Sequence, residues 1–239
     1  MKIKNIIALL LLLTIATYPQ VITGLWIGTV EVNKVNEVYS GANNTQINTP
    51  APVKYPFNLQ YLFHTDSSGV TKLLKEVYIM QSKDSNHTRV LVTDETRFSD
   101  FEGIIRKGDN KLVPVRLTSP SIDFDTTKQN LILNGAISNE GMSVVSGVDI
   151  IHDKLHPTNP FRHQFHPNHK EGRTITRSFS IEINASNIDN SPSVGQTRLR
   201  ATYRETLIGL HREALKVSGP MTLTQISTIG ILNPSASGK

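Results

Sequence analysis

Histidine is concentrated in one segment of the chain, HPTNPFRHQFHPNHKEG (residues 156–172), which holds four of the eight histidines. His163, His166 and His169 recur at every third position, and His156 lies upstream. Three prolines within the segment exclude a helix, and a spacing of three places successive side chains of a strand on opposite faces. If the imidazoles converge, they must therefore do so from a turned loop.

Three converging imidazoles could bind zinc, with water or a carboxylate such as Asp149, Asp153 or Glu171 as a further ligand. A zinc ion with an open position would support a hydrolase in which Glu205 moves the proton. Alternatively, the imidazoles hydrogen-bond to backbone and pack on neighbouring phenylalanines, which orders the loop. The spacing matches no recognised zinc motif, so zinc is the one cofactor suggested, none is certain, and both interpretations stay open.

A second polar cluster lies in TYRETLIGLH (residues 202–211). On a strand, Tyr203 and Glu205 share one face while Arg204 lies on the other, and His211 follows a glycine at an expected turn. Glu205 among apolar neighbours could serve as a general base, or it could form an ion pair with an arginine or a histidine. No GxSxG, P-loop, GxGxxG or HExxH motif accompanies either cluster, so the catalytic residues remain unknown.

The elements that must position these clusters are strands, because the dominant sequence period is two. In residues 56–64, Phe57, Leu59, Tyr61 and Phe63 alternate with mostly polar residues, which predicts one buried and one solvated face. Turn formers at 65–69 and a rougher alternating run at 70–81 predict a long hairpin. Eight further strands are expected at residues 25–34, 89–93, 112–118, 131–137, 142–151, 174–184, 198–207 and 215–226.

About ten strands joined by turn-like segments predict an all-β fold, an antiparallel β-sandwich or, alternatively, a barrel. One short helix is expected within residues 94–106, where apolar residues recur at helical spacing. Trp26 alternates with valines and is expected in the core. Long loops are expected at residues 36–54, 152–173 and 185–196.

The sequence predicts that the chain is divided into three parts. Residues 1–22 combine Lys2 and Lys4 with an apolar run too short to span a bilayer, as in a signal peptide. A single β-rich domain is expected over 23–232, followed by a flexible tail over 233–239. The protein is therefore expected to be secreted, periplasmic or on the cell surface, without a membrane span after cleavage.

Composition limits the partners. The chain has no cysteine, which excludes disulfides, a thiol nucleophile and a cysteine-ligated zinc. It carries 25 basic and 20 acidic residues, a net charge of +5, or +3 without the two leader lysines. Because no basic run occurs, we expect no nucleic acid partner. The expected partner is a surface or extracellular component whose identity is unknown.

Several segments occur together in a familiar order: GLWIGTVEVNKV, PFNLQYLFHTDSSGVTKLL, VLVTD, NPFRHQFHPNH with ITRSFSIEI, and YRETLIGLH with LKVSG. Across most of residues 24–226 the chain resembles a recurring, largely uncharacterised domain of bacterial secreted and cell-surface proteins. The NPFRHQFHPNH and YRETLIGLH segments carry most of this likeness. The resemblance implies export and a β-rich fold, and it supplies no catalytic residue.

Three functions are consistent with these patterns. The first is an exported, non-enzymatic binding or structural module with the histidine-rich loop as its site. The second is the zinc-dependent hydrolase. The third is a carbohydrate-binding module, which ranks last because only 6% of residues are aromatic and most lie on expected core faces.

Overall fold

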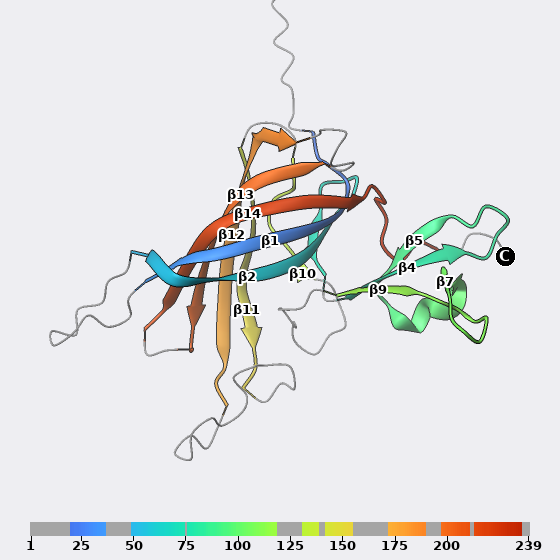
Figure 1. Ribbon diagram of the computed structural model, residues 1–239, viewed down its shortest axis with the longest axis horizontal. Helices are drawn as coiled ribbons and strands as arrows, with labels where there is room; N and C mark the ends of the chain where they lie inside the picture. Colours follow the sequence, from blue (N-terminus) through green and yellow to red (C-terminus); the bar gives the residue numbers. More distant parts are fainter. Residues whose placement is uncertain are drawn as a thin grey trace, which may run out of the picture.

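The computed structural model describes residues 20–36, 49–74, 76–118, 131–138, 142–154, 172–189, 197–210 and 213–235. These residues form fourteen strands and one short helix, and the strands within each sheet are antiparallel, as the expected all-β class requires (Figure 1). The long strands are β1 (Gly24–Val35), β2 (Ala51–Thr65), β4 (Glu76–Ser82), β11 (Met142–His152), β12 (Ile175–Asp189), β13 (Arg198–Ile208) and β14 (Leu215–Ser227). The short ones are β3 (Thr71–Leu73), β5 (Arg89–Val92), β6 (Phe101–Glu102), β7 (Ile105–Arg106), β8 (Leu112–Val113), β9 (Val115–Thr118) and β10 (Leu131–Ile132).

Eight strands form one sheet, hereafter the large sheet, in the order β10-β3-β2-β1-β14-β13-β12-β11. The sheet curls until its two ends meet, since Asn134, just after β10, and Ser146 of β11 exchange two backbone hydrogen bonds of 2.9 Å. This contact makes the large sheet nearly closed. Of the two expected architectures, the barrel therefore describes it better than the sandwich.

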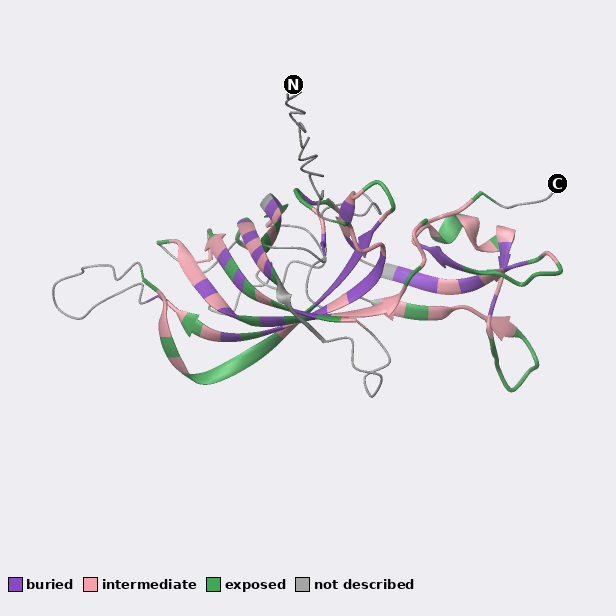
Figure 2. Cartoon of the chain, turned by 90° about the horizontal axis from the view of Figure 1, so that it is seen from above, coloured by how far each residue is buried: buried purple, intermediate pink, exposed green. Residues whose placement is uncertain are grey.

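Alternation along these strands fills the inside of the large sheet with apolar side chains. Figure 2 shows this alternation as bands of buried and more exposed residues along the strands. Trp26 is fully buried there, as expected, together with Tyr61 and Tyr203. Gly28 leaves room for this packing, because a Cβ at that position would lie 2.1 Å from Cε of Met221. The interior is thus a packed core.

A smaller sheet lies beside one end of the large sheet (Figure 1). Its β4 pairs with β5, β6 and β9, while β7 and β8 form a separate two-stranded ribbon. Leu25 and Leu62 of the large sheet pack with Leu74, Val77 and Leu91 in one buried apolar cluster. This shared core joins the two sheets.

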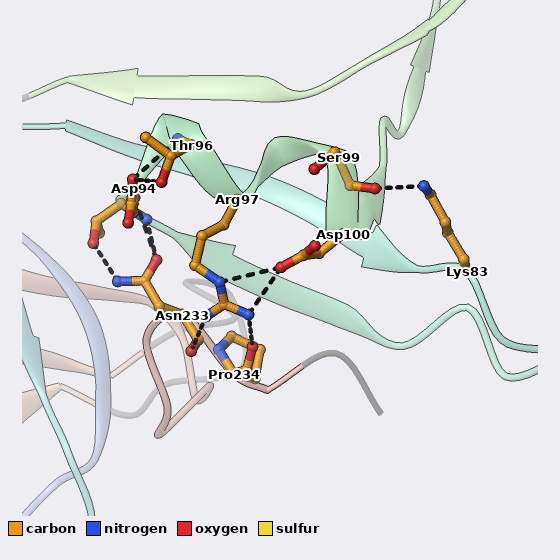
Figure 3. Close-up of polar contacts among 9 residues, drawn as sticks. Lys83, Asp94, Thr96, Arg97, Ser99, Asp100, Asn233 and Pro234 are labelled. Atoms are coloured by element: carbon orange, nitrogen blue, oxygen red, sulfur yellow. Dashed lines mark hydrogen bonds and ion pairs between the residues drawn. The ribbon is translucent and has the colours of Figure 1, made fainter. Parts of the chain in front are cut away.

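The segment after β14 runs onto the small sheet and is held there by Asn233 (Figure 3). The Asn233 side chain accepts a hydrogen bond from the Thr93 amide at 2.7 Å and donates one to the Thr93 hydroxyl at 2.7 Å. Arg97 donates to the carbonyls of Asn233 and Pro234 at 2.7 and 2.8 Å. Asn233 and Pro234, the first residues of the expected tail, thus make hydrogen bonds to the small sheet, while residues 236–239 lie outside the described part and the flexible tail stays a prediction.

The predicted long hairpin forms only at its closed end. Residues 63–65 of β2 pair with β3, after which the chain leaves the large sheet and β4 joins the small one. The alternation over 70–81 is real, but alternation fixes which face is buried and does not specify the neighbouring strand. Phe57 departs from its expected core position, being 48% exposed in the middle of β2 beside an irregularity in the pairing of β2 with β1.

The helix and the loop ends also differ from expectation. The helix is a single 3-10 segment, η2 (Glu95–Asp100), whose N-cap Asp94 accepts a hydrogen bond from the Thr96 amide, and β6 and β7 follow it. Residues 51–54, His152 and residues 185–189 belong to strands rather than to the expected loops. Within the described ranges no helix has the length and apolar character needed to cross a bilayer.

Candidate functional site

The histidine candidates fall largely beyond what the structure describes. His156, His163, His166, His169 and His211 all lie outside the described residues, and a zinc site there stays a prediction. Among the residues that are described, no group of three or more His, Asp or Glu side chains is placed to hold a metal ion.

The second cluster, in contrast, is well placed and contributes to a buried polar network inside the large sheet. Glu205 of β13 accepts a hydrogen bond from Nε of Arg177 on β12 at 2.5 Å and one from the hydroxyl of Tyr203 at 2.8 Å. The Tyr203 hydroxyl also lies 2.6 Å from the hydroxyl of Tyr61, which comes from β2. An Arg177 guanidinium nitrogen lies 3.4 Å from the same Tyr61 hydroxyl. We call these four residues the inner network.

Burial sets the electrostatics of the inner network. It raises the pKa of the Tyr61 hydroxyl, and the charge of Glu205 raises it further. Burial likewise raises the pKa of Tyr203, with Tyr61 and Glu205 adding to the effect. Burial alone would lower the pKa of Arg177, but the charge and hydrogen bond of Glu205 outweigh it and raise that pKa. The stable state is therefore an ion pair flanked by two neutral phenols.

This arrangement is suited to cross-linking strands rather than to chemistry on a substrate. The Glu205 side chain is 1% exposed, and both of its oxygens accept hydrogen bonds from the network. Tyr61, Tyr203 and Phe179 stack around it with ring centroids 5.6–6.0 Å apart. Of the two interpretations of Glu205, the ion pair is the one observed, and its partner is Arg177 on the neighbouring strand.

The opposite face of the same strands carries a groove of about 580 Å³. One row of neighbouring residues crosses five strands of the large sheet within it. Lys34 of β1 pairs with Ser218 of β14, Ser218 with Arg204 of β13, Arg204 with Ser180 of β12, and Ser180 with Ser146 of β11. The residues on either side of this row include Lys216, Ser178, Thr202 and Thr206. We call this feature the outer groove.

The cations of the outer groove differ in their partners. Arg204 forms an ion pair with Glu182 at 2.5 Å, and this hydrogen bond raises the pKa of Arg204. Within the described part of the chain, neither Lys34 nor Lys216 has an acidic partner within ion-pair distance. The only carboxylate among the described lining residues is that of Glu205, which points into the core and is bound to Arg177. Two positive charges of the groove thus have no acidic partner among the residues that the structure describes.

The backbone under these lysines is firmly held. Asn36, only 3% exposed, exchanges hydrogen bonds with the Lys216 backbone, its amide donating to the Lys216 carbonyl at 3.0 Å and its side chain accepting from the Lys216 amide at 2.7 Å. The Asn36 side chain also donates to the Ala214 carbonyl at 3.1 Å. The ends of β1 and β14 that carry Lys34 and Lys216 are therefore fixed relative to each other.

Comparison with known proteins adds no identity to this geometry. A scan against protein-family models and a search of curated proteins found no match to the chain. The resemblance to a domain of bacterial surface proteins accordingly stays a prediction, and the site must be argued from its own residues.

Tyr203, Arg204 and Glu205 were recognised from the sequence, which distinguished them only by strand face. Arg177 and Tyr61 complete the inner network from other strands; Arg177 was not recognised, and Tyr61 was expected only as a core residue. Lys34 and Lys216 were not recognised either. A usable signal exists in RSFSIEI and TYRET, where every second position is hydroxylated or charged, although the register that aligns these positions across strands is a tertiary property.

Proposed function

We propose that this protein is an exported, non-enzymatic binding module that holds its ligand in the outer groove. The observation that carries the proposal is a pair of lysines, Lys34 and Lys216, in a groove of about 580 Å³, with no acidic partner for either among the described residues. A volume of this size lies within the range of small-molecule sites, about 300–1,000 Å³. The groove thus combines room for a ligand with charge that a ligand can neutralise.

The opposite face of the strands supports the non-enzymatic half of the proposal. Glu205 is the general-base candidate of this cluster, yet it is buried and accepts a hydrogen bond from Tyr203, which is also buried. A general base must come within hydrogen-bond reach of the proton that it removes. The inner network instead gives the binding face a rigid support.

The binding half is tested by a paired thermal-shift screen of small molecules against the wild type and Ser180→Phe. The phenyl ring would fill the middle of the groove, so compounds that stabilise the wild type should lose their effect on the variant. Thr222→Phe is the matched control, since Thr222 is exposed on β14 and is not among the described residues that line the groove. Compounds that stabilise Ser180→Phe as strongly as the wild type would contradict the proposal.

The non-enzymatic half has its own measurement. A compound identified in the screen should be recovered unchanged by mass spectrometry after prolonged incubation with the protein. Conversion of the compound, lost in a groove variant, would show that the protein is an enzyme.

Export rests on the sequence alone, and two contacts near the amino terminus support a leader that ends before Val21. Val21 forms a bridge to Ser138, and the Ile22 amide donates to the Ile137 carbonyl at 2.9 Å. Since these contacts belong to the folded part, we expect cleavage before Val21 rather than after residue 22. Amino-terminal sequencing of the secreted protein measures this directly, and an intact Met1 in that fraction would contradict a cleaved leader.

A further inference from the structure

We infer that the ligand of the outer groove is a small organic polyanion with at least two carboxylate or phosphate groups. This inference rests on the proposed function, because it assigns a ligand class to the same groove. The charge of the groove supports this ligand class. Lys34 and Lys216 lack acidic partners within the described residues, whereas the third cation, Arg204, is bound to Glu182. A ligand with one negative charge would leave one of the two lysines uncompensated.

The spacing of the two lysines indicates a compact ligand. Lys34 is directly opposite Ser218 on β14, and Lys216 is two residues from Ser218 on the same strand. Diagonal neighbours of this kind have their Cα atoms about 7–8 Å apart and project from the same face. Both ammonium groups can therefore reach one compact molecule, provided that its anionic groups are separated by only a few bonds.

The other residues that line the groove are mostly polar. Among the described residues, six hydroxylated ones line the groove, namely Ser146, Ser178, Ser180, Thr202, Thr206 and Ser218. Hydroxyls donate to oxyanions and also accept from ligand hydroxyls. Phe179 is the only aromatic residue among the described lining, and its ring stacks on Tyr61 and Tyr203 in the core. The described lining thus offers no platform for stacking a neutral sugar ring, and it favours a ligand held by charge and hydrogen bonds.

The experiment is isothermal titration of the full chain with citrate and with fructose 1,6-bisphosphate. The two compounds distinguish a site for carboxylates from a site for phosphates. Acetate and glucose are the singly charged and neutral comparisons. At least one polyanion should bind, at least about tenfold more tightly than acetate or glucose, and raising the salt concentration should weaken it by screening. Lys34→Gln with Lys216→Gln should reduce the affinity about tenfold.

Lys107→Gln with Lys111→Gln is the matched control, because it removes two exposed charges from the ribbon of β7 and β8, outside the groove. This variant should bind like the wild type. Failure of both polyanions to bind the wild type, or full affinity in the Lys34 and Lys216 double variant, would overturn the inference. An unchanged thermal midpoint in the double variant establishes that any lost binding is not lost folding.

The failure of this inference can be told from that of the proposed function. A neutral compound that is blocked by Ser180→Phe but bound normally by the lysine double variant would overturn the polyanion assignment and leave the binding groove in place. Polyanion binding that Ser180→Phe leaves intact would overturn both.

Discussion

The two faces of β13 carry ion pairs of equal length in opposite surroundings. On the inner face Glu205 meets Arg177 at 2.5 Å, with side chains 1% and 11% exposed. On the outer face Arg204 meets Glu182 at 2.5 Å, with side chains 52% and 37% exposed. Distance alone would rank the two pairs as equivalent. The two pairs differ in their exposure to solvent. Charges in the interior lose hydration that only their partners replace, while charges at the surface keep most of it.

The difference assigns the two faces distinct roles. The inner pair is buried and hydrogen-bonded to Tyr203 and Tyr61, so it links β2, β12 and β13. The outer face carries exposed charge, and two of its lysines have no acidic partner among the described residues. Neighbouring residues of YRET thus alternate between the structural inner face and the outer face at which we propose binding.

The strongest test of this contrast is removal of the inner carboxylate. Glu205→Ala leaves the Arg177 guanidinium buried without its counter-charge, so the free energy of unfolding should fall by about 3–5 kcal/mol. Urea denaturation measures the loss. Glu182→Ala, the matched change on the outer face, should cost no more than about 1 kcal/mol.

Replacement of the whole inner pair sharpens the same point. Arg177→Met combined with Glu205→Leu removes both charges and should recover much of the loss, since a buried pair replaced by apolar residues is often nearly neutral. The double variant could instead lose as much stability as the two single variants together. In that case the ion pair itself, and not the isolated charge, would determine the stability.

The next largest loss of stability is expected when one phenol hydroxyl is removed. Tyr203→Phe removes the hydroxyl that donates to Glu205 and contacts the Tyr61 hydroxyl. Both of these partner groups are in the core. Leaving buried polar groups unsatisfied costs about 1–3 kcal/mol, and we expect a loss in that range by urea denaturation. Tyr55→Phe is the control, because the Tyr55 ring is 76% exposed, and it should change stability by less than about 0.5 kcal/mol.

Some properties of this molecule follow from the local sequence pattern, and others depend on how the strands assemble into sheets. Alternation was enough to predict long strands such as β1, β11, β13 and β14, and it put Tyr203 and Glu205 on one face and Arg204 on the other. It could not pair Glu205 with Arg177, because that contact depends on the register of β12 against β13. Nor could it break the run over 70–81 into β3 and β4, since the buried face of Leu74 and Val77 looks the same whichever sheet covers it. Local pattern determines faces, and only the assembled sheet determines partners.

Alkaline pH offers a further separation of the two faces. The folded-state pKa values of Tyr61 and Tyr203 are raised by burial, whereas in the unfolded chain both phenols ionise near about 10. The folded state then holds more protons than the unfolded state above that pH, so stability is retained below about pH 10 and falls as the pH rises further. Urea midpoints between pH 8 and 11 measure the slope. Tyr61→Phe with Tyr203→Phe should flatten it, and an unchanged slope would show that the inner phenols do not control the alkaline loss.

The smallest effect is expected at the outer pair, and it decides whether burial or geometry controls these contacts. Arg204→Ala and Glu182→Ala, singly and together, form a double-mutant cycle whose coupling energy isolates the Arg204–Glu182 interaction. We expect about 0.2–1 kcal/mol, reduced further at high salt, because both side chains keep much of their contact with water. A coupling above about 2 kcal/mol that persists in salt would mean that the outer face is as strongly organised as the inner one. The contrast between a structural and a binding face of β13 would then no longer hold.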